Sequence, residues 1–172
     1  TLGVFQLGES LAPLCMKIKP NNIQGISDIN ALGRPSVPAQ NRETYIDRRL
    51  GKKPIVYSHP NLERSLKPTF GTSLYEEGMI TIVADCAGWS LAKADNLRKI
   101  TKLKGKDPEL VAKTESDFIK DSVIFSRMTK EKAKEIWDNE ISSFGEYGFN
   151  ASHSIAYSHI SYYTAWLRRH YK

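Results

Sequence analysis

The sequence predicts an all-α protein, built as an irregular helical array, with room for a small β element near residues 54–74. Long runs without Gly or Pro carry apolar residues at the helical period, most clearly in residues 151–172. Helix-start and helix-stop signals recur, such as Asp107-Pro108-Glu109 before one run and Gly88 after another. The connections are short and contain Pro or Gly, which favours helices that pack directly on one another.

The first half of the chain predicts four helices. The first covers residues 9–17, and the second covers residues 23–34 with a break at Gly33. A third, cationic helix ends within residues 45–53, where Gly51 closes it, and a fourth covers residues 75–87. Residues 54–69 contain three prolines and therefore predict a loop that is partly extended.

The second half predicts helices that begin at recognisable caps. Ser90 caps a helix that continues toward residue 106, and Asp107 starts another that reaches about residue 123. The second of these is polar on most sides, so we expect it at the periphery. Thr129 opens a further helix, and the spacing of its apolar residues places Trp137 in the core.

The last helix is expected to start at a cap provided by Asn150 or Ser152 and to continue to the end of the chain. One of its faces is apolar, and it is formed by Ala156, Ile160, Tyr163 and Leu167. Another face is polar with little charge, and it is formed by His153, Tyr157, Ser161, Thr164 and Arg168. Such a face suits a phosphate and a stacked base, or equally a half-buried helix whose polar groups bond to neighbouring protein.

Composition limits the classes of function. The 172 residues suffice for one domain with a core, and the first residues read as the interior of a longer protein. Lys and Arg outnumber Asp and Glu by 25 to 19, and the pI of about 9.3 favours polyanionic partners. There is no apolar run long enough for a membrane span, no signal peptide, and no metal-ligand spacing around Cys15 or Cys86. We therefore expect a cytoplasmic protein with reduced thiols, no membrane contact and no metal site.

The strongest charge pattern lies in residues 90–106. Five cations fall within nine residues with no acid between them: Arg98, Lys99, Lys102, Lys104 and Lys106. If the helix continues, Arg98 and Lys102 share a face, as do Lys102 and Lys106, and each like-charge pair costs roughly a few tenths of a kcal/mol. A bound anion would relieve this repulsion. The alternative is a solvated basic face near a helix C-terminus, where cations are favoured anyway.

Arg34 lies in a stiff stretch, because Pro35 and Pro38 disfavour helix at the residues before them. A guanidinium held in this way can clamp phosphate oxygens, and a surface or salt-bridging role is the alternative. A two-metal site needs clustered carboxylates. No DxD arrangement joins the candidate acids, which are Asp28, Asp47, Asp85 and Asp95.

Residues 147–167 read YGFN-x-SH-x-x-AY-x-x-x-SY-x-TAWL. They resemble the segment YGFNKSHxxAYxxxSYxTAxLK of the alpha subunit of bacterial DNA polymerase III, a C-family polymerase. Shorter stretches are similar to other motifs of that family: GVFQL at 3–7, ALGRPS at 31–36, YEEGM at 75–79 and ADNLRK at 94–99. The sequence departs from these motifs where Glu76 and Gly78 replace two Gln, Lys99 replaces Arg, and Ala151 replaces Lys.

The resemblance implies the fingers region of a replicative DNA-directed DNA polymerase, with residues 1–172 as a single segment and the palm, thumb and other domains outside it. It implies binding of template-primer DNA and of the triphosphate of the incoming deoxynucleoside triphosphate (dNTP). The implied phosphate-binding residues are Arg98, Lys99 and Lys102, with Arg34 as a helper. It places Asn150, Ser152 and His153 near the phosphates or the sugar, and Tyr157 near the base. It assigns contacts with the DNA to Lys104, Lys106 and Arg168.

The same resemblance places the catalytic carboxylates, and the Mg²⁺ that they bind, in the palm. Residues 1–172 would then hold no catalytic residue and be inactive alone, and the further partners would be the remaining polymerase domains and a sliding clamp. The alternatives are a non-catalytic basic helical module that binds DNA and a helical protein-interaction module. Binding to a DNA backbone would weaken steeply with salt, whereas a triphosphate pocket would prefer nucleotide to duplex. The polymerase interpretation requires the basic helix and the last helix to converge on one nucleotide pocket.

Overall fold

The computed structural model describes residues 3–8, 10–103, 105–142 and 148–171. Its regular elements are helices, and none of these described residues forms a β-strand, which confirms the predicted all-α class. The chain divides into two compact units, each of which is described by itself. The terminal unit comprises Thr1–Ile55 and Phe149–Lys172, and the middle unit comprises Val56–Gly148.

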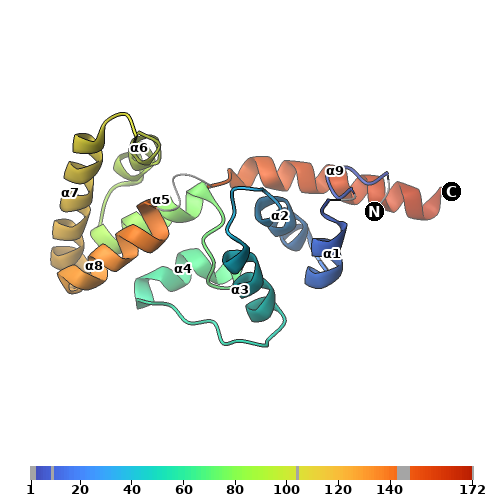
Figure 1. Cartoon of the computed structure of the whole chain (residues 1–172), viewed down its shortest axis with the longest axis horizontal. Coiled ribbons are helices and arrows are strands. Elements are labelled where there is room, and N and C mark those ends of the chain that lie inside the picture. Colours follow the sequence, from blue (N-terminus) through green and yellow to red (C-terminus); the bar gives the residue numbers. More distant parts are fainter. Residues whose placement is uncertain (1–2, 9, 104, 143–147, 172) are drawn as a thin grey trace. The chain divides into compact units, whose positions relative to one another are not determined.

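The terminal unit contains four helices among its described residues (Figure 1). They are α1 (Ala12–Ile18), α2 (Ile23–Leu32), α3 (Ala39–Arg49) and α9 (Ala151–His170). Asn22 caps α2, because its Oδ1 accepts the N–H of Gly25 at 2.8 Å. Helix α1 begins three residues later than the sequence predicts. The most extensive packing in this unit is between α2 and α9.

Serines form the buried face of α9. Ser154, Ser158 and Ser161 are all fully buried, and Ser154 Oγ donates to the Ser27 carbonyl of α2 at 2.9 Å. Ser158 Oγ accepts from Asn30 Nδ2 at 3.2 Å and donates to the carbonyl of Ser154 at 2.7 Å. Small side chains let the two helix backbones approach closely, and each hydroxyl finds a partner, so burying them costs little.

The apolar face of α9 predicted from the sequence is largely exposed. Ile160, Tyr163 and Leu167 are 45%, 59% and 50% exposed. Counting hydrophobic residues along the helical period overlooked the serine stripe, because a serine that bonds to a carbonyl one turn earlier behaves as a small packing residue.

A buried polar pair stabilises the rest of the terminal unit. Asp28 on α2 and Tyr45 on α3 are both fully buried, and the Tyr45 hydroxyl donates to Asp28 Oδ2 at 2.5 Å. Gln24 Nε2 donates to the other carboxylate oxygen at 2.8 Å. Burial and the neighbouring Asp28 charge raise the pKa of Tyr45 far above its ordinary value, so this hydroxyl remains a donor at all physiological pH values. Asp28 is therefore part of the structural core of the unit.

The middle unit begins with short helical turns and continues with longer helices (Figure 1). The short elements are η1 (Pro60–Leu62), α4 (Glu63–Leu66) and η2 (Lys67–Thr69). The longer ones are α5 (Glu76–Ala87), α6 (Leu91–Thr101), α7 (Pro108–Ser126) and α8 (Lys130–Ile136), followed by the π-helix η3 (Trp137–Ser142). Helix α5 packs against both α6 and α7, and α7 packs against α8.

The β element expected near residues 54–74 is absent, and all residues of this range are described. Pro60 and Pro68 each stand in the first turn of a 3-10 helix. A proline in that position loses no hydrogen bond, because the first N–H groups of a helix are unpaired anyway, and its fixed φ suits the turn. Two of the three prolines that suggested an extended loop therefore lie in helical turns, whereas Pro54 and the rest of residues 54–59 form the predicted loop.

Aromatic rings form the core of the middle unit. Trp137 is 1% exposed, and its ring centroid lies 5.6 Å from that of Phe118, which lies 6.2 Å from that of Trp89. The predicted core position of Trp137 is thus confirmed. Helix α7 buries one face, at Val111, Thr114, Phe118 and Ser122, and packs on α5, while its other residues are at least partly exposed. The apolar contacts predicted for Val111 and Phe118 are therefore confirmed, and one-sided burial is what we expected of a peripheral helix.

The helix boundaries of this unit follow the local signals in the sequence. Ser90, Asp107 and Thr129 each accept a backbone N–H with their side chains, at 3.3, 3.0 and 3.2 Å respectively. Gly88 ends α5 with a φ of 68°, a left-handed conformation that suits glycine. Burial raises the pKa of the Cys86 thiol to about 12, so this cysteine is protonated. No helix in the described part of the chain has the length and apolarity needed to cross a bilayer.

Candidate functional site

Helix α6 positions the candidate phosphate-binding cations of the middle unit. Ala94 and Leu97 are buried and fix the inner face of the helix. Arg98 follows them with its side chain 32% exposed, and Lys102, the C-cap residue, has its side chain 51% exposed. The cations gather at the helix C-terminus, where the helix dipole favours positive charge.

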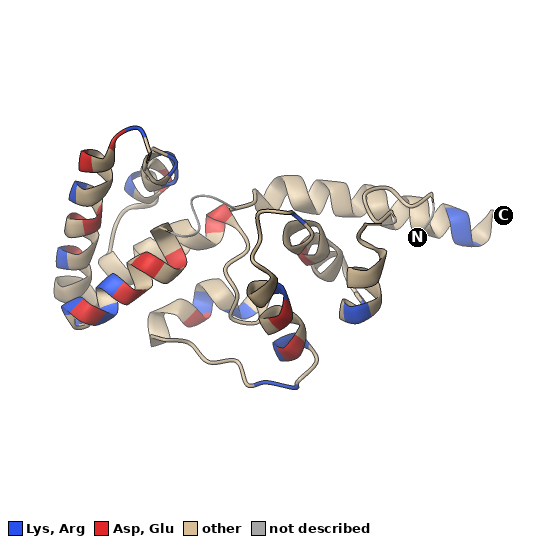
Figure 2. Ribbon diagram, viewed as in Figure 1, with Lys and Arg blue, Asp and Glu red and all other residues tan. Residues whose placement is uncertain are grey.

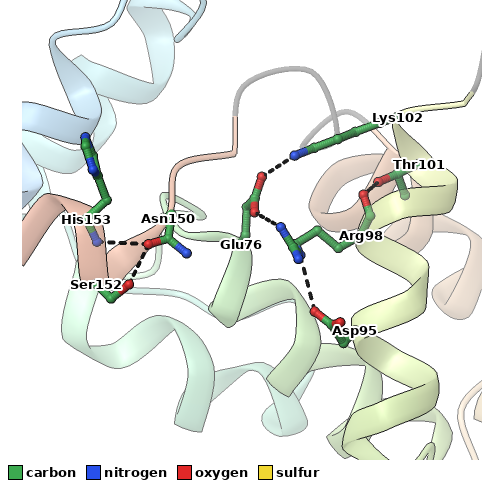
Figure 3. Close-up of polar contacts among 8 residues, drawn as sticks. All are labelled: Glu76, Asp95, Arg98, Thr101, Lys102, Asn150, Ser152 and His153. Atoms are coloured by element: carbon green, nitrogen blue, oxygen red, sulfur yellow. Dashed lines mark hydrogen bonds and ion pairs between the residues drawn. The ribbon is translucent and has the colours of Figure 1, made fainter.

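Arg98 and Lys102 both bind the carboxylate of Glu76, the first residue of α5 (Figure 3). Nη1 of Arg98 donates to Oε2 at 2.9 Å, and Nζ of Lys102 donates to Oε1 at 2.7 Å. Nε of Arg98 also donates to Asp95 Oδ1 at 3.3 Å. Each oxygen of Glu76 is thus engaged by one cation. We call Arg98 and Lys102 the cation pair.

The ion pairs keep Glu76 ionised. Its side chain is only 9% exposed, and burial by itself raises the pKa of a carboxyl group. The hydrogen bonds from Lys102 and Arg98 outweigh burial, so the pKa of Glu76 lies below its ordinary value. The same bonds raise the pKa of Arg98. A buried negative charge therefore lies beneath two cations that both reach solvent.

The repulsion predicted along the basic stretch is relieved within the protein itself. Glu76 precedes Arg98 by 22 residues and Lys102 by 26, so no local pattern around the cations reveals it. Helix α6 also ends at Thr101, and Lys106 lies in the turn that follows. The predicted i,i+4 pair of Lys102 and Lys106 does not form, whereas Arg98 and Lys102 share a face as predicted and bind the same carboxylate.

Two further candidate cations near the end of α6, and one on α9, are exposed. Lys99 and Lys106 are exposed and form no ion pair with another described residue, and Lys104 lies outside the described residues. Arg168 is exposed in the last turn of α9. Figure 2 shows that α9 has no acidic residue and carries its Arg residues near its C-terminal end. These positions are compatible with contacts to a polyanion, because long exposed cations can adapt to a phosphate backbone.

The terminal unit contains a cavity of about 300 Å³ that brings three of the predicted site residues together. Arg34, His153 and Tyr157 line it, with Asn30 and Phe149 among their neighbours. Three segments meet at this cavity: residues 6, 10 and 11, the end of α2 with the residues that follow it, and the start of α9 with the residue before its cap. Asn30 Oδ1 is buried and has no hydrogen-bond partner in the described structure, so the cavity wall contains an acceptor that a ligand could use.

Aromatic rings form a column along this wall. The ring centroids of Phe149 and His153 are 5.5 Å apart, those of His153 and Tyr157 are 4.1 Å apart, and Phe5 lies 5.2 Å from Tyr157. The guanidinium carbon of Arg34 lies 4.9 Å from the centroid of Phe149, a cation–π contact that fixes its direction. The i,i+4 spacing of His153 and Tyr157 on α9 brings their rings into contact, at an interplanar angle of 40°.

Asn150 and Ser152 organise the start of α9. Asn150 Oδ1 accepts the N–H of His153 at 2.9 Å and the hydroxyl of Ser152 at 2.6 Å (Figure 3). Asn150 is therefore the N-cap of α9, which is one of the two residues predicted for this role. Ser152 supports the cap through its hydrogen bond to Asn150. Both side chains thereby fix the first turn that presents His153.

The comparisons with known proteins agree with this architecture. The family model described as "Bacterial DNA polymerase III alpha subunit finger domain" matches residues 1–124. The chain belongs to this finger-domain family. The membership confirms the resemblance inferred from the sequence motifs.

Curated relatives extend the match to nearly the whole chain. The DNA polymerase III subunit alpha of Ureaplasma parvum is 36% identical over 172 residues, covering 99% of this chain and 17% of the relative. Those of Aquifex aeolicus and Halalkalibacterium halodurans are 38% and 40% identical, again covering 99% of this chain and 15% of each relative. The finger domain thus spans about a sixth of the length of these relatives.

Within the finger domain, the structure groups the predicted site residues into two sets. Arg98 and Lys102 meet in the middle unit, while Arg34, His153 and Tyr157 meet in the terminal unit. The convergence of the two sets on one nucleotide remains a prediction. Over the described ranges of the chain, no group of three or more His, Cys, Asp or Glu is arranged to hold a metal ion.

Sequence reasoning missed Glu76 and Asn30. Glu76 stood out only as a departure from a family motif, and its role depends on the packing of α5 against α6. Asn30 lies on an ordinary helix, and nothing in its spacing distinguishes it from a surface amide. Both became visible only when segments distant in sequence were brought together.

Proposed function

We propose that this finger domain serves a replicative DNA-directed DNA polymerase by binding the incoming dNTP and the template-primer DNA. The family membership supports the proposal, since the relatives are DNA polymerase III alpha subunits of which the chain covers a defined part. The observation that carries it is the cation pair: Arg98 and Lys102 are fixed in position and both reach solvent. A triphosphate has about three to four negative charges and needs preorganised cations of this kind.

In this proposal Arg98, Lys99 and Lys102 hold the triphosphate, and Arg34 assists from the terminal unit. His153 lies near the phosphates or sugar and Tyr157 near the base, while the capping pair Asn150 and Ser152 fixes the turn that presents them. The DNA backbone is contacted by Lys104, Lys106 and Arg168. The column of rings in the terminal unit supports the base-stacking role, because aromatic faces stack on any base.

The chemistry itself is assigned to the rest of the protein. We place the catalytic carboxylates and their Mg²⁺ in the palm, outside residues 1–172, so that the finger domain alone is inactive. We propose that its further partners are the remaining polymerase domains and a sliding clamp, and that the protein is cytoplasmic. What this chain's own residues do is bind, orient and neutralise the substrate.

The test is replacement of Arg98 by Ala in the full-length protein. Loss of a charge-assisted contact to phosphate is expected to raise the KM for dNTPs by about 10- to 100-fold. Arg64→Ala is the matched control, because Arg64 also pairs with a carboxylate, that of Asp85 at 2.5 Å, on an exposed side chain of the same unit. It is expected to change the KM by less than about twofold.

An unchanged dNTP KM and kcat in Arg98→Ala would remove Arg98 from the site. The alternative, a non-catalytic DNA-binding module, would be supported by two results together. The logarithm of the DNA-binding constant would fall steeply with the logarithm of the salt concentration, and the protein would show no preference for nucleotide over duplex DNA.

A further inference from the structure

We propose that Glu76 is an internal anion that limits the affinity of the cation pair for phosphate-bearing ligands. The inference rests on the proposed phosphate-binding function and adds a residue that sets how tightly the phosphates are held. In that function pyrophosphate leaves from the same cations, so a weaker hold favours its release.

The geometry places the carboxylate where a ligand's phosphate oxygens would otherwise bind. The two oxygens of Glu76 each accept one bond from the cation pair, at 2.9 Å from Arg98 Nη1 and 2.7 Å from Lys102 Nζ. Adjacent oxygens of a phosphate group would bind two such cations in the same manner. The carboxylate occupies one donor of each cation, so a phosphate must bind their remaining donors, in a positive field that the carboxylate weakens.

The charges of the cluster are balanced. Arg98 and Lys102 contribute two positive charges, and Glu76 and Asp95, which is 3.3 Å from Arg98, contribute two negative ones. Asp95 has its side chain 45% exposed, so solvent and salt screen its charge. Glu76 is 9% exposed and cannot be screened in this way, which makes it the dominant opposing charge.

The negative charge of Glu76 is also permanent near neutral pH. Its hydrogen bonds from Lys102 and Arg98 hold its pKa below the ordinary value despite burial, and it stands at the N-terminus of α5, where an acid is favoured. Glutamine at this position would have nearly the same shape and one acceptor oxygen, but no charge. The exchange of Glu for Gln thus separates the charge of the side chain from its role in packing.

The size of the effect follows from Coulomb's law. A phosphate on the far side of the guanidinium would lie about 7 Å from the carboxylate, and each ligand charge at that distance changes the binding constant roughly threefold in a water-like dielectric. With about one to three ligand charges within a Debye length, Glu76→Gln is expected to tighten tripolyphosphate binding by about 3- to 30-fold. The gain should increase from phosphate through pyrophosphate to tripolyphosphate.

The experiment measures binding of these three inorganic probes to the full-length protein by isothermal titration calorimetry. Glu115→Gln is the matched control: its carboxylate pairs with Lys134 at 2.8 Å in the same unit, and its replacement changes the net charge by the same amount. It is expected to shift the dissociation constants by less than about twofold, because its charge is not in contact with the cation pair.

Arg98→Ala separates this inference from the proposed function. If Arg98→Ala binds tripolyphosphate as tightly as the wild type, the phosphate-binding function of the cation pair fails. If Arg98→Ala weakens binding while Glu76→Gln leaves it unchanged or weakens it, only the role of Glu76 as a limiting anion is refuted. Tighter binding by Glu76→Gln with no dependence on ligand charge would also refute it.

A second variant keeps the inference testable if Glu76→Gln does not fold. Asp95→Asn removes the other carboxylate bound to Arg98 from a position whose side chain is 45% exposed, so its folding cost is small. It is expected to tighten tripolyphosphate binding by about twofold. No gain from this variant would contradict the view that neighbouring acids limit the affinity of the cation pair.

Discussion

The clearest stability prediction concerns the hydroxyl of Tyr45, which Tyr45→Phe removes while the ring remains. Both Tyr45 and its partner Asp28 are fully buried, and the hydroxyl donates to the carboxylate at 2.5 Å. Without it, Asp28 loses a donor that water cannot replace. The change therefore affects the desolvated carboxylate more than the packing around it.

The magnitude follows from the charge of the acceptor. A hydrogen bond to a charged group contributes about 1.5–3 kcal/mol, so we expect Tyr45→Phe to lower the free energy of opening of the terminal unit by about 2 kcal/mol. Gln24 still donates to the other oxygen of Asp28, which limits the loss. A change of about 2 kcal/mol corresponds to amide exchange about 30-fold faster in α2 and α3.

Native-state hydrogen exchange followed by mass spectrometry is the suitable assay, because it reports each helix separately in a longer protein. Tyr163→Phe is the control, since Tyr163 is 59% exposed and in the same unit. It should change the free energy of opening by less than about 0.5 kcal/mol. An effect of Tyr45→Phe equally small would refute the reasoning that the buried Asp28 depends on this hydroxyl.

Three further predictions concern helix packing, pH dependence and capping. Ser158→Leu should lower the free energy of unfolding in urea by about 1–3 kcal/mol, because the larger side chain overpacks the close contact of α2 with α9. The control, Ile160→Ser on the exposed face of α9, should change it by less than about 0.5 kcal/mol. Asp121 accepts bonds from Trp89 Nε1 at 2.6 Å and from a lysine; burial raises its pKa, but these bonds outweigh burial and lower it. The stabilisation from Asp121 is therefore present above its unfolded pKa of about 3.9 and lost as the pH falls through the lower folded value, so the stability difference between wild type and Asp121→Asn should be constant at neutral pH and shrink in acid. Asn150→Ala should cost about 1 kcal/mol, seen as faster exchange in the first turn of α9, while Asn150→Asp should retain the cap; equal losses in both variants would contradict the capping role.

Local signals predicted the helices well because they act within one or two turns. The side chains of Ser90, Asp107 and Thr129 satisfy N–H groups three residues away, and Gly88 adopts the left-handed conformation that ends a helix. The prolines of residues 54–69 were harder to interpret. Proline fits both an extended loop and the first turn of a helix, and only the surrounding packing selects between them.

The candidate site was predictable in its residue types but not in its electrostatics. The sequence identified Arg98, Lys102, His153 and Tyr157, and the structure brings the two cations together in one unit and the two rings together in the other. The sequence did not reveal which carboxylate pairs with the two cations, because Glu76 lies on a different helix. The charge pattern along one helix reveals only the repulsion between charges on that helix. The net charge of a cluster also depends on the charged residues of every element packed against the helix.

The sequence by itself determined where several helices of this finger domain begin, at caps such as Ser90, Asp107 and Thr129, and through its motifs the family to which it belongs. Only the tertiary structure decided which faces of these helices are buried and which charges meet. Capping and backbone preferences are set by neighbours in the chain, so they can be inferred from the sequence. The burial of the serine stripe of α9 and the pairing of Glu76 with two cations depend on contacts between segments more than twenty residues apart, and these exist only after the chain has packed.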